Sequence, residues 1–430
     1  MTNYSRFATA VALRGSAICC SFLITILLAR ALNTAEYGSY IFALSVLTIL
    51  AIPIQSGLPE LIVREASAAD GASDHRRVKG LLIRAFQFSL VLPILMMTIW
   101  LLIVFAFPQA FDVFPETSLI SLAIFALPAL ALLAVIGAAL RAFQVYFAGQ
   151  VLGLLLSRLL NLVLLVAVVS LPFFGTLTAT SAISVYILAA AGTLIVATYV
   201  LYKQKGRNWF ALKARFETRK WAKGILPLSL IAGLQIIVSK TDIVMLRGLL
   251  GPSDVAIYHV ASQFGNLVLI AKSGVLMVAG PRMARLYADA NMPRMQVELS
   301  QAARFVFLSG LPIAVVLILF GRPLLNFAFG PEFSDAYTTM VIIAVGYLAL
   351  SLFGTIDTLL KMTNRENVVL KSIAIAIVLN IALNAILIPS YGNAGAAVAS
   401  AVSMLAWRCV VVWQAYRSLG LVSFAISPKP

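Results

Sequence analysis

The chain has 430 residues, of which 61% are hydrophobic and only 11% are charged, and its mean hydropathy is +0.99. Charged residues make up about a quarter of an ordinary soluble domain, so this composition excludes one and indicates a multispanning membrane protein. The formal net charge of +16 lies mostly in loops, as described below, and we expect no nucleic-acid partner.

A transmembrane helix needs about 20 predominantly apolar residues, and twelve stretches of the chain meet this requirement. They cover roughly residues 7–32, 37–63, 80–106, 118–141, 148–170, 179–202, 225–250, 254–280, 303–321, 336–360, 368–389 and 395–417. The predicted fold class is all-α: a polytopic membrane protein of about 12 transmembrane helices. The intervals between the stretches are too short for a soluble domain.

Landmarks of the first half recur in the second half, in the same order and at a near-constant spacing. The matches are Glu36 and Tyr40 with Asp254 and Tyr258 (254 − 36 = 218), Pro93 with Pro312 (312 − 93 = 219), FAFPQAF from Phe105 with FAFGPEF from Phe327 (327 − 105 = 222), and LPFFG from Leu171 with IPSYG from Ile388 (388 − 171 = 217). This pattern predicts a duplication. It gives two pseudo-symmetric six-helix lobes, residues 1–202 and 225–430, joined by a linker of residues 203–224.

The first span has features of a signal peptide, because Arg6 and Arg14 precede its apolar run and Ala29-Arg30-Ala31 has the form of a cleavage site. We expect no cleavage, which would remove the helix that precedes Glu36 in the first repeat. In the second span, Pro53, Gly57 and Pro59 predict a bent helix, either lining a cavity or forming a packing kink.

Basic residues collect in alternate loops. Residues 203–223 hold eight Lys or Arg against one acid, Glu217. The other basic loops carry Arg76, Arg77 and Lys79, and Arg282, Arg285 and Arg294. By the positive-inside rule these loops and both termini are cytoplasmic. Within the linker, Trp209, Leu212 and Phe216 have the spacing of one helical face, which is typical either of an interfacial helix or of a solvated segment.

Motifs for catalysis and cofactor binding are absent from the sequence. The two histidines, His75 and His259, have no neighbours at metal-ligand spacing, and there is no phosphate-binding loop or nucleophile elbow. Cys19, Cys20 and Cys409 lie in apolar stretches and suggest no disulfide framework. We therefore expect no enzyme, no cofactor and no metal site.

Charges inside the spans are expensive unless they face a partner or water, so they are the candidate functional residues. Arg14 and Lys272 lie roughly 10 to 12 Å from the cytoplasmic ends of their spans, where they either snorkel or face a cavity. Lys240 and Asp242 lie near the middle of the seventh span and are two residues apart, so they point to different faces. Asp242 is either a coupling site or the partner of a cation. Weaker candidates are Arg158, Arg247 and Arg408, for which structural pairing or snorkelling is the alternative.

Three segments carry a resemblance to a known family. They are ARALNTAEYGSYIFALS after the first span, KTDIVMLRGLLGPSDVAIYHVAS across the seventh and eighth, and NFAFGPEF with IPSYGNAGAAVAS late in the chain. These segments look like those of lipid-linked oligosaccharide (O-antigen or exopolysaccharide repeat-unit) flippases of the multidrug, oligosaccharidyl-lipid and polysaccharide exporter superfamily. The resemblance covers nearly the whole chain.

The resemblance implies two facing six-helix lobes, with the first, second, seventh and eighth spans lining a central cavity. A polyprenyl-pyrophosphate-linked glycan is the implied substrate, because its diphosphate cannot cross about 30 Å of hydrocarbon unaided. Arg14, Lys240 and Lys272 would bind the diphosphate, with Asp242 as a coupling residue or charge partner. The implied location is the bacterial cytoplasmic (inner) membrane. Candidate protein partners are a glycan polymerase and a chain-length regulator.

Three other functions remain open at this stage. A peptidoglycan-precursor flippase is the nearest, although the chain is short for one. A cation-coupled drug exporter of the same superfamily would favour acidic cavity residues, whereas three of the four charges named above are basic. A membrane-embedded glycan polymerase or ligase would need a sizeable external loop and a catalytic base, and the sequence offers neither.

Overall fold

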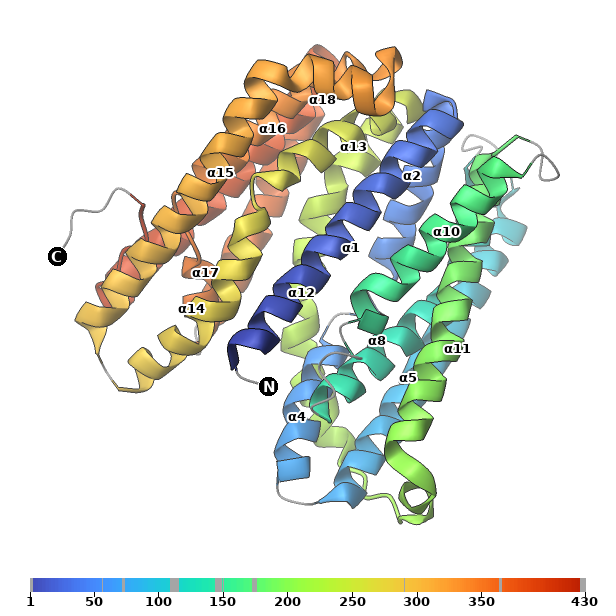
Figure 1. Cartoon of the computed structure of the whole chain (residues 1–430), viewed down its shortest axis with the longest axis vertical. Coiled ribbons are helices and arrows are strands. Elements are labelled where there is room, and N and C mark those ends of the chain that lie inside the picture. Colours follow the sequence, from blue (N-terminus) through green and yellow to red (C-terminus); the bar gives the residue numbers. More distant parts are fainter. Residues whose placement is uncertain are drawn as a thin grey trace. The chain divides into compact units, whose positions relative to one another are not determined.

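The computed structural model describes residues 3–55, 57–71, 74–108, 116–143, 149, 151–171, 176–289, 291–362 and 366–425. Every regular element in these residues is helical (Figure 1), which confirms the all-α prediction. The chain divides into two compact units, Met1–Ile236 and Ile237–Pro430. The division falls inside one helix, α12 (Thr218–Leu249), so this helix contributes to both units. The predicted lobes at 1–202 and 225–430 stay predictions.

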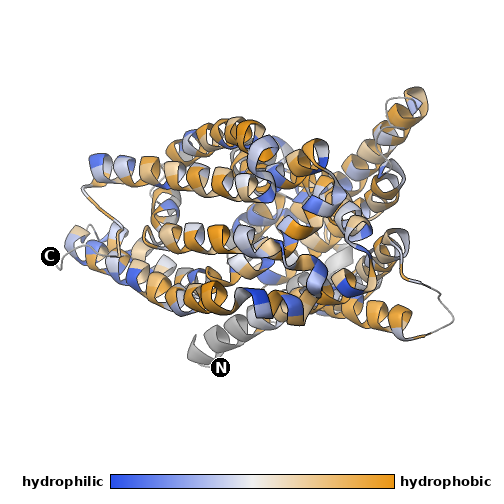
Figure 2. Cartoon of the chain, turned by 90° about the horizontal axis from the view of Figure 1, so that it is seen from above, coloured by the Kyte–Doolittle hydropathy of each residue, from blue (hydrophilic) through white to orange (hydrophobic). Residues whose placement is uncertain are grey.

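The first unit consists of long apolar helices and shorter pieces. They are α1 (Asn3–Ala31), α2 (Thr34–Leu50), α3 (Ile52–Gln55), α4 (Leu58–Gly71), α5 (His75–Ala106), α7 (Thr117–Ile124), α8 (Leu127–Ala142), the π-helical turn η1 (Val151–Leu156), α10 (Ser157–Ser170), α11 (Ala179–Ala211) and the start of α12. The outer helices expose large apolar side chains, such as Val91 and Phe105 of α5, and apolar residues dominate the ribbons in Figure 2. Such surfaces suit hydrocarbon rather than water.

The second unit has fewer but longer helices. They are the rest of α12, α13 (Pro252–Leu267), α14 (Ile270–Ala288), α15 (Met292–Phe329), the 3-10 turn η3 (Pro331–Phe333), α16 (Ala336–Ser351), α17 (Ile356–Met362) and α18 (Glu366–Leu419). Helix α18 merges two predicted spans across a kink at Gly392, whose φ is 57°. Because Gly392 is not helical, the predicted spans 368–389 and 395–417 correspond to the two arms of α18 on either side of it.

The number of membrane spans depends on how broken helices are counted. Six helices of the described chain are long and apolar enough to cross a membrane, and a bent pair makes a seventh. Three shorter apolar helices, Gly15–Ala31, Ser157–Ser170 and Ala336–Ser351, fall within other predicted spans. The multispanning character is confirmed, and the figure of about twelve spans stays a prediction.

The predicted bend in the second span is present. Helix α2 ends at Leu50, and the segment Ile52–Ala66 continues at an angle of 51° to it. Gly57 has φ +78°, and a Cβ added there would lie 2.5 Å from the hydroxyl oxygen of Ser229. Glycine is therefore required both for the backbone conformation and for the close approach of α12.

The second helix of the second unit is broken at the equivalent point. Helix α13 ends at Leu267 and α14 begins at Ile270, although the sequence predicted one continuous span over residues 254–280. Leu269 corresponds to Ala51, the residue that follows α2 (269 − 51 = 218). Both repeats therefore interrupt their second span at the same position. Only the first interruption has a Pro and Gly signature, and it was the only one expected.

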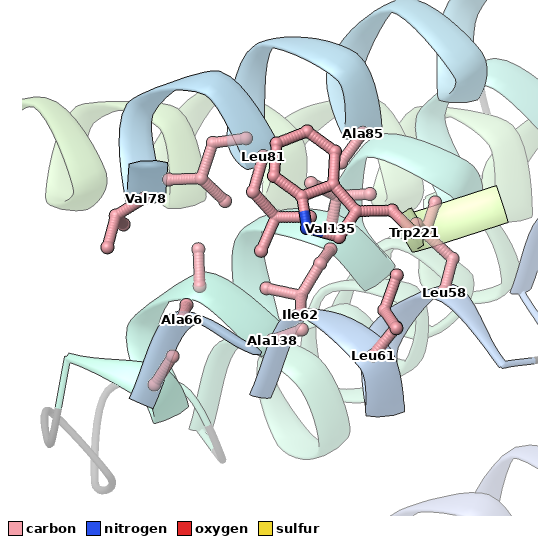
Figure 3. Packing of buried hydrophobic residues seen from close by; sticks show 13 residues of the cluster. Leu58, Leu61, Ile62, Ala66, Val78, Leu81, Ala85, Val135, Ala138 and Trp221 are labelled. Atoms are coloured by element: carbon pink, nitrogen blue, oxygen red, sulfur yellow. The ribbon is translucent and has the colours of Figure 1, made fainter. Parts of the chain in front are cut away.

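The core beside the bend joins α4, α5, α8 and the first turn of α12. Buried Leu58, Leu61 and Ile62 of α4 pack with Leu81 of α5 around the indole of Trp221 (Figure 3). Burying an aliphatic or aromatic side chain of this size contributes roughly 1.5–3 kcal/mol. The start of α12 is thus held in the first unit by its own apolar contacts.

The helical face predicted for Trp209, Leu212 and Phe216 does not form. Helix α11 ends at Ala211, and residues 213–217 have no regular structure. Lys79 donates to the carbonyl oxygen of Leu212 at 2.8 Å, and the backbone N–H of Arg215 donates to the carbonyl oxygen of Arg76 at 2.9 Å. These contacts with the start of α5 outweigh the local helical pattern.

The single acid of the linker is the centre of an ion network. Glu217 lies 3.3 Å from Arg77, 3.5 Å from Arg215 and 3.9 Å from Lys220, measured between side-chain oxygen and nitrogen atoms. Arg77 also pairs with Glu65 of α4 at 2.6 Å. Isolated surface ion pairs contribute little, but a network of several charges is more favourable. This one ties the linker to α4, α5 and α12.

The linker packing can be tested at Gly80. A Cβ there would lie 1.8 Å from the carbonyl oxygen of Arg215, so Gly80→Ala should push residues 213–217 away from α5 and destabilise the fold by about 1–3 kcal/mol. Limited trypsin digestion should then cleave after Lys213 or Arg215 several times faster. Gly248→Ala is the control, since its Cβ would meet nothing within 4 Å. Unchanged digestion of the Gly80→Ala protein would contradict the docked linker.

Candidate functional site

Asp242 lies at the centre of a buried polar cluster in the second unit. Only 4% of the residue is exposed. Its Oδ2 accepts hydrogen bonds from the hydroxyls of Tyr258, at 2.5 Å, and Ser400. Its Oδ1 accepts from the side-chain amides of Asn384, at 2.8 Å, and Asn380, at 3.2 Å. The carboxyl group therefore has four hydrogen-bond donors in a protein interior.

Three helices supply these groups. Asp242 is on α12 and Tyr258 is on α13, whereas both asparagines and Ser400 are on α18. The asparagines are four residues apart, which puts them on one helical face, and Asn384 also donates to Asn380 at 3.1 Å. Ser400 follows the Gly392 kink. Together these contacts join α12, α13 and the two arms of α18.

All four donors to Asp242 are neutral, and no cation of the described chain forms an ion pair with it. The Oδ1 of Asn384 is buried and receives no hydrogen bond from the described residues. Carboxylate, amide and hydroxyl oxygens are the ligands that hard cations prefer. A proton or a small monovalent cation would compensate the charge of Asp242 in this setting. Among the described residues there is no group of three or more His, Cys, Asp or Glu that suits a transition metal.

The two strongest lysine candidates are half-buried in the second unit. Lys240 is on α12 and is an electrostatic neighbour of His259. Lys272 lies in the first turn of α14, directly after the break in the eighth predicted span. A helix N-terminus favours negative charge, so a lysine there and the helix end both suit an anion.

Three of the arginine candidates are in different places. Arg14 belongs to α1, but its side chain lies outside the described residues. Arg158 is half-buried in α10, and Arg247 is half-buried in the last turn of α12. Among the described side chains, neither Arg158 nor Arg247 hydrogen-bonds to Asp242.

Arg408 forms a buried ion pair. Its Nη1 lies 2.5 Å from Oδ1 of Asp357, and its guanidinium stacks on the ring of Trp407, 4.7 Å from the centroid. The pair joins α18 to α17 within one unit. This geometry favours the structural pairing that was the alternative for Arg408.

One intramembrane cation was not recognised from the sequence. Arg141, at the end of α8, lines a cavity of about 260 Å³ together with Gln55 and Pro59 of the bent second span and Gly153 of η1. Arg141 is the last residue of the predicted span 118–141, where a basic residue is ordinarily a topology signal. The cluster partners of Asp242 were also missed, although paired Asn380 and Asn384 in an apolar span were a usable signal.

The first unit keeps a neutral counterpart of the Asp242 cluster. Tyr40 corresponds to Tyr258 and is a neighbour of Asn161, which corresponds to Asn380 (380 − 161 = 219). The residue equivalent to Asp242 at a spacing of 217 is Thr25 (242 − 25 = 217), whose hydroxyl donates to the carbonyl oxygen of Ser21. The repeats therefore share a tyrosine and an asparagine at matching positions. At the third position, the first repeat has Thr25 and the second has the acid Asp242.

Two family profiles and two known membrane proteins match the sequence of this chain. The family profile described as "Polysaccharide biosynthesis protein" matches residues 11–287, and the MatE profile matches residues 227–386. A probable low-salt glycan biosynthesis flippase of Haloferax volcanii is 25% identical over 162 residues, or 38% of this chain and 34% of that protein. An uncharacterised membrane protein of Methanocaldococcus jannaschii is 21% identical over 233 residues, or 53% of this chain and 46% of that protein. The matches thus span less than half of either relative.

Solved structures share the fold. An inward-facing multidrug resistance MATE transporter of the MOP superfamily matches with a TM-score of 0.77 at 16% identity, covering 95% of this chain and 98% of that one. A lipid II flippase in an inward closed conformation matches with a TM-score of 0.72 at 13% identity, covering 95% and 87%. These likenesses establish the fold of a membrane transporter.

The role of the Arg408 pair can be measured with a double-mutant cycle. Asp357→Asn should destabilise the protein by about 3–5 kcal/mol, because it leaves the buried guanidinium without its partner charge. Arg408→Met in the same background should restore much of that loss. Thermal unfolding in detergent provides the measurement. Equal stability of Asp357→Asn and the parent protein would show that the pair has no structural role.

Proposed function

Since the chain belongs to the family of polysaccharide biosynthesis proteins, we propose that it flips polyprenyl-pyrophosphate-linked oligosaccharide units across the cytoplasmic membrane by alternating access. The glycan flippase relative and the transporter fold support this proposal. The product would serve the biosynthesis of surface polysaccharide. The proposed location is the inner membrane with both termini cytoplasmic, consistent with the basic loops.

The observation that carries the proposal is the broken second span of each unit. Helix breaks at membrane depth are tolerated where they line a cavity or are buried in protein, and interrupted helices in corresponding positions are typical of transporter substrate sites. In the second unit the break supplies a helix N-terminus together with Lys272. The equivalent position in the first unit is apolar Ile54 (272 − 54 = 218). The N-terminus of α14 with Lys272 is therefore a single anion-binding site, which suits a substrate with one diphosphate group.

The remaining cations would act at other depths. Lys240 would hold the charge of the substrate near mid-membrane, and Arg14 would contact the diphosphate near the inner opening. Arg158 and Arg247 are weaker candidates for the same role. Arg408 is better explained by its pair with Asp357 and is left out of the proposed site.

The cation site can be tested by neutralisation. Arg14→Gln, Lys240→Gln and Lys272→Gln should each reduce display of surface polysaccharide in a complementation assay while the protein stays in the membrane. Lysine should rescue position 14 only partly, because arginine makes forked contacts with phosphate. Arg322→Gln, at an exposed arginine of α15, is the matched control. Full display with the triple glutamine variant would refute the site.

The nature of the carrier lipid separates this proposal from its nearest alternative. A peptidoglycan-precursor flippase shares the fold and would also use cavity cations. Complementation of strains that lack either type of flippase distinguishes the two. We expect rescue of polysaccharide display and no rescue of cell-wall synthesis. Expression of the protein should also leave the export of cationic drugs unchanged, because the proposed cations would repel such compounds.

Asp242 is the proposed coupling residue. It is buried and lies among neutral oxygen and nitrogen groups, so uptake of a proton or a sodium ion would neutralise a costly charge. Binding at this point would change the contacts among α12, α13 and α18. A gradient of the ion could therefore shift the balance between conformations, provided that they differ in affinity for it.

The coupling role can be tested with Asp242→Asn, which removes the charge at nearly constant shape. No cation of the described chain depends on Asp242, so the variant should fold and still bind the lipid-linked glycan. Its transport in proteoliposomes should no longer respond to an imposed pH or sodium gradient. Asp254→Asn is the control, because Asp254 receives a hydrogen bond from Asn393 in a half-buried position. A normal gradient response of Asp242→Asn would eliminate the coupling role.

A further inference from the structure

A large apolar groove lies in the first unit, apart from the residues proposed to bind the substrate. Its volume is about 780 Å³, within the usual range for sites that hold small ligands. Its walls are formed by Leu58 and Leu61 of α4, Leu81 and Phe88 of α5, and Trp221 and Ile225 of α12. The groove reaches the surface, since Phe88 is 38% exposed and Val91, further along α5, is 65% exposed.

The groove has one cationic side chain on its wall. Arg84 of α5 lines it together with Gln87. The guanidinium donates to Gln87 Oε1 at 2.8 Å and stacks on the ring of Phe216, 4.8 Å from its centroid. No carboxylate of the described chain pairs with Arg84. Held by a neutral amide and an aromatic ring, its positive charge is available to an anion.

The position of Arg84 along α5 places that charge near the membrane surface. Helix α5 begins at His75 in a basic loop, so Arg84 is nine residues further on (84 − 75 = 9), or about 13 Å along the axis. The first turns carry Arg76, Arg77 and Lys79, which mark the cytoplasmic side. Arg84 then lies near the headgroups of the inner leaflet, and the apolar walls beside Phe88 and Val91 extend toward the hydrocarbon.

We propose that this groove binds an anionic phospholipid of the cytoplasmic leaflet, with Arg84 on the phosphate and an acyl chain against Leu61, Phe88 and Ile225. Basic pockets between transmembrane helices on the cytoplasmic side are suited to anionic headgroups. An apolar chain fits walls that offer few polar partners. The charge of Arg84 and the lining of the groove thus match the two parts of such a lipid.

A resident phospholipid fits better than the transported lipid. One cation suits a phosphate diester, whereas a diphosphate would be expected to need several. The groove is also formed entirely by residues of the first unit and its cation is near one membrane surface, so an occupant has no path to the other leaflet within it. The lipid would bridge α4, α5 and the start of α12 and thereby stabilise the segment that follows the linker.

The proposal can be tested by lipid retention and thermal stability. In native mass spectrometry, the delipidated protein should take up phosphatidylglycerol in preference to phosphatidylcholine, and phosphatidylglycerol should raise its Tm. Arg84→Gln should weaken binding about tenfold, through loss of a charged hydrogen bond. Ala222→Trp should also abolish uptake, because exposed Ala222 lines the groove and a larger side chain would fill it. Arg219→Gln removes an equal charge outside the groove lining and should bind normally.

Two outcomes would overturn the proposal. One is equal uptake of phosphatidylglycerol by Arg84→Gln, Ala222→Trp and the parent protein. The other is displacement of phosphatidylglycerol by a lower concentration of polyprenyl phosphate, which would assign the groove to the transported lipid. Both are equilibrium binding measurements with the whole protein, so they succeed or fail independently of the proposed transport activity.

Discussion

The constraint behind this structure is that hydrocarbon offers no hydrogen-bond partners. Backbone N–H and C=O groups must be satisfied within the protein, which leaves helices as the solution for an apolar chain of this composition. Each departure from regular helix at membrane depth then needs a local reason. At Gly57 the reason is the close approach of α12, and at Gly392 it is a kink that brings Ser400 to Asp242 together with Asn380 and Asn384. The kink at Gly392 is therefore the break that brings polar groups together.

Because of the duplication, both repeats have polar residues at matching positions. The repeats differ by single substitutions that add a charge in the second one. Tyr40 with Asn161 and Tyr258 with Asn380 occupy matching positions, but the acid is present only in the second unit. The break of the second span also differs in charge between the repeats. Lys272 follows it in the second repeat, and the equivalent residue of the first repeat is Ile54. A neutral polar cluster rigidifies a core without needing an ion, whereas a buried carboxylate needs compensation. Charge differences between the repeats thus favour the second unit for the proposed coupling role and for the proposed anion site at Lys272.

Some of these features could be predicted from the sequence because they depend on local composition. Apolar stretches gave the helical membrane fold, and Pro53, Gly57 and Pro59 gave the bend. Asn380, Asn384 and Ser400 lie 138 to 158 positions from Asp242 in the chain, so their contact with it could not be predicted, although the paired asparagines in an apolar span were a usable signal of a polar site. The break at Val268 lacks the prolines that flank the first one, and glycines alone did not indicate it. Of the two alternatives for the linker, residues 213–217 do not adopt the helical one, because hydrogen bonds from Lys79 and Arg215 outweigh a three-residue periodicity, as tertiary contacts commonly do for short segments.

Helix α12 connects the features on which the functional proposals rest. Its first turn is fixed by Glu217 and by burial of Trp221 in the first unit, and its later turns carry Lys240 and Asp242 in the second. Pro227 lies inside α12 between these two parts, and an interior proline removes a helical hydrogen bond and favours a bend, so each part of the helix is positioned by the packing of its own unit. Neutralisation of Asp242 would release one end of this helix, and a lipid in the groove beside Trp221 would hold the other.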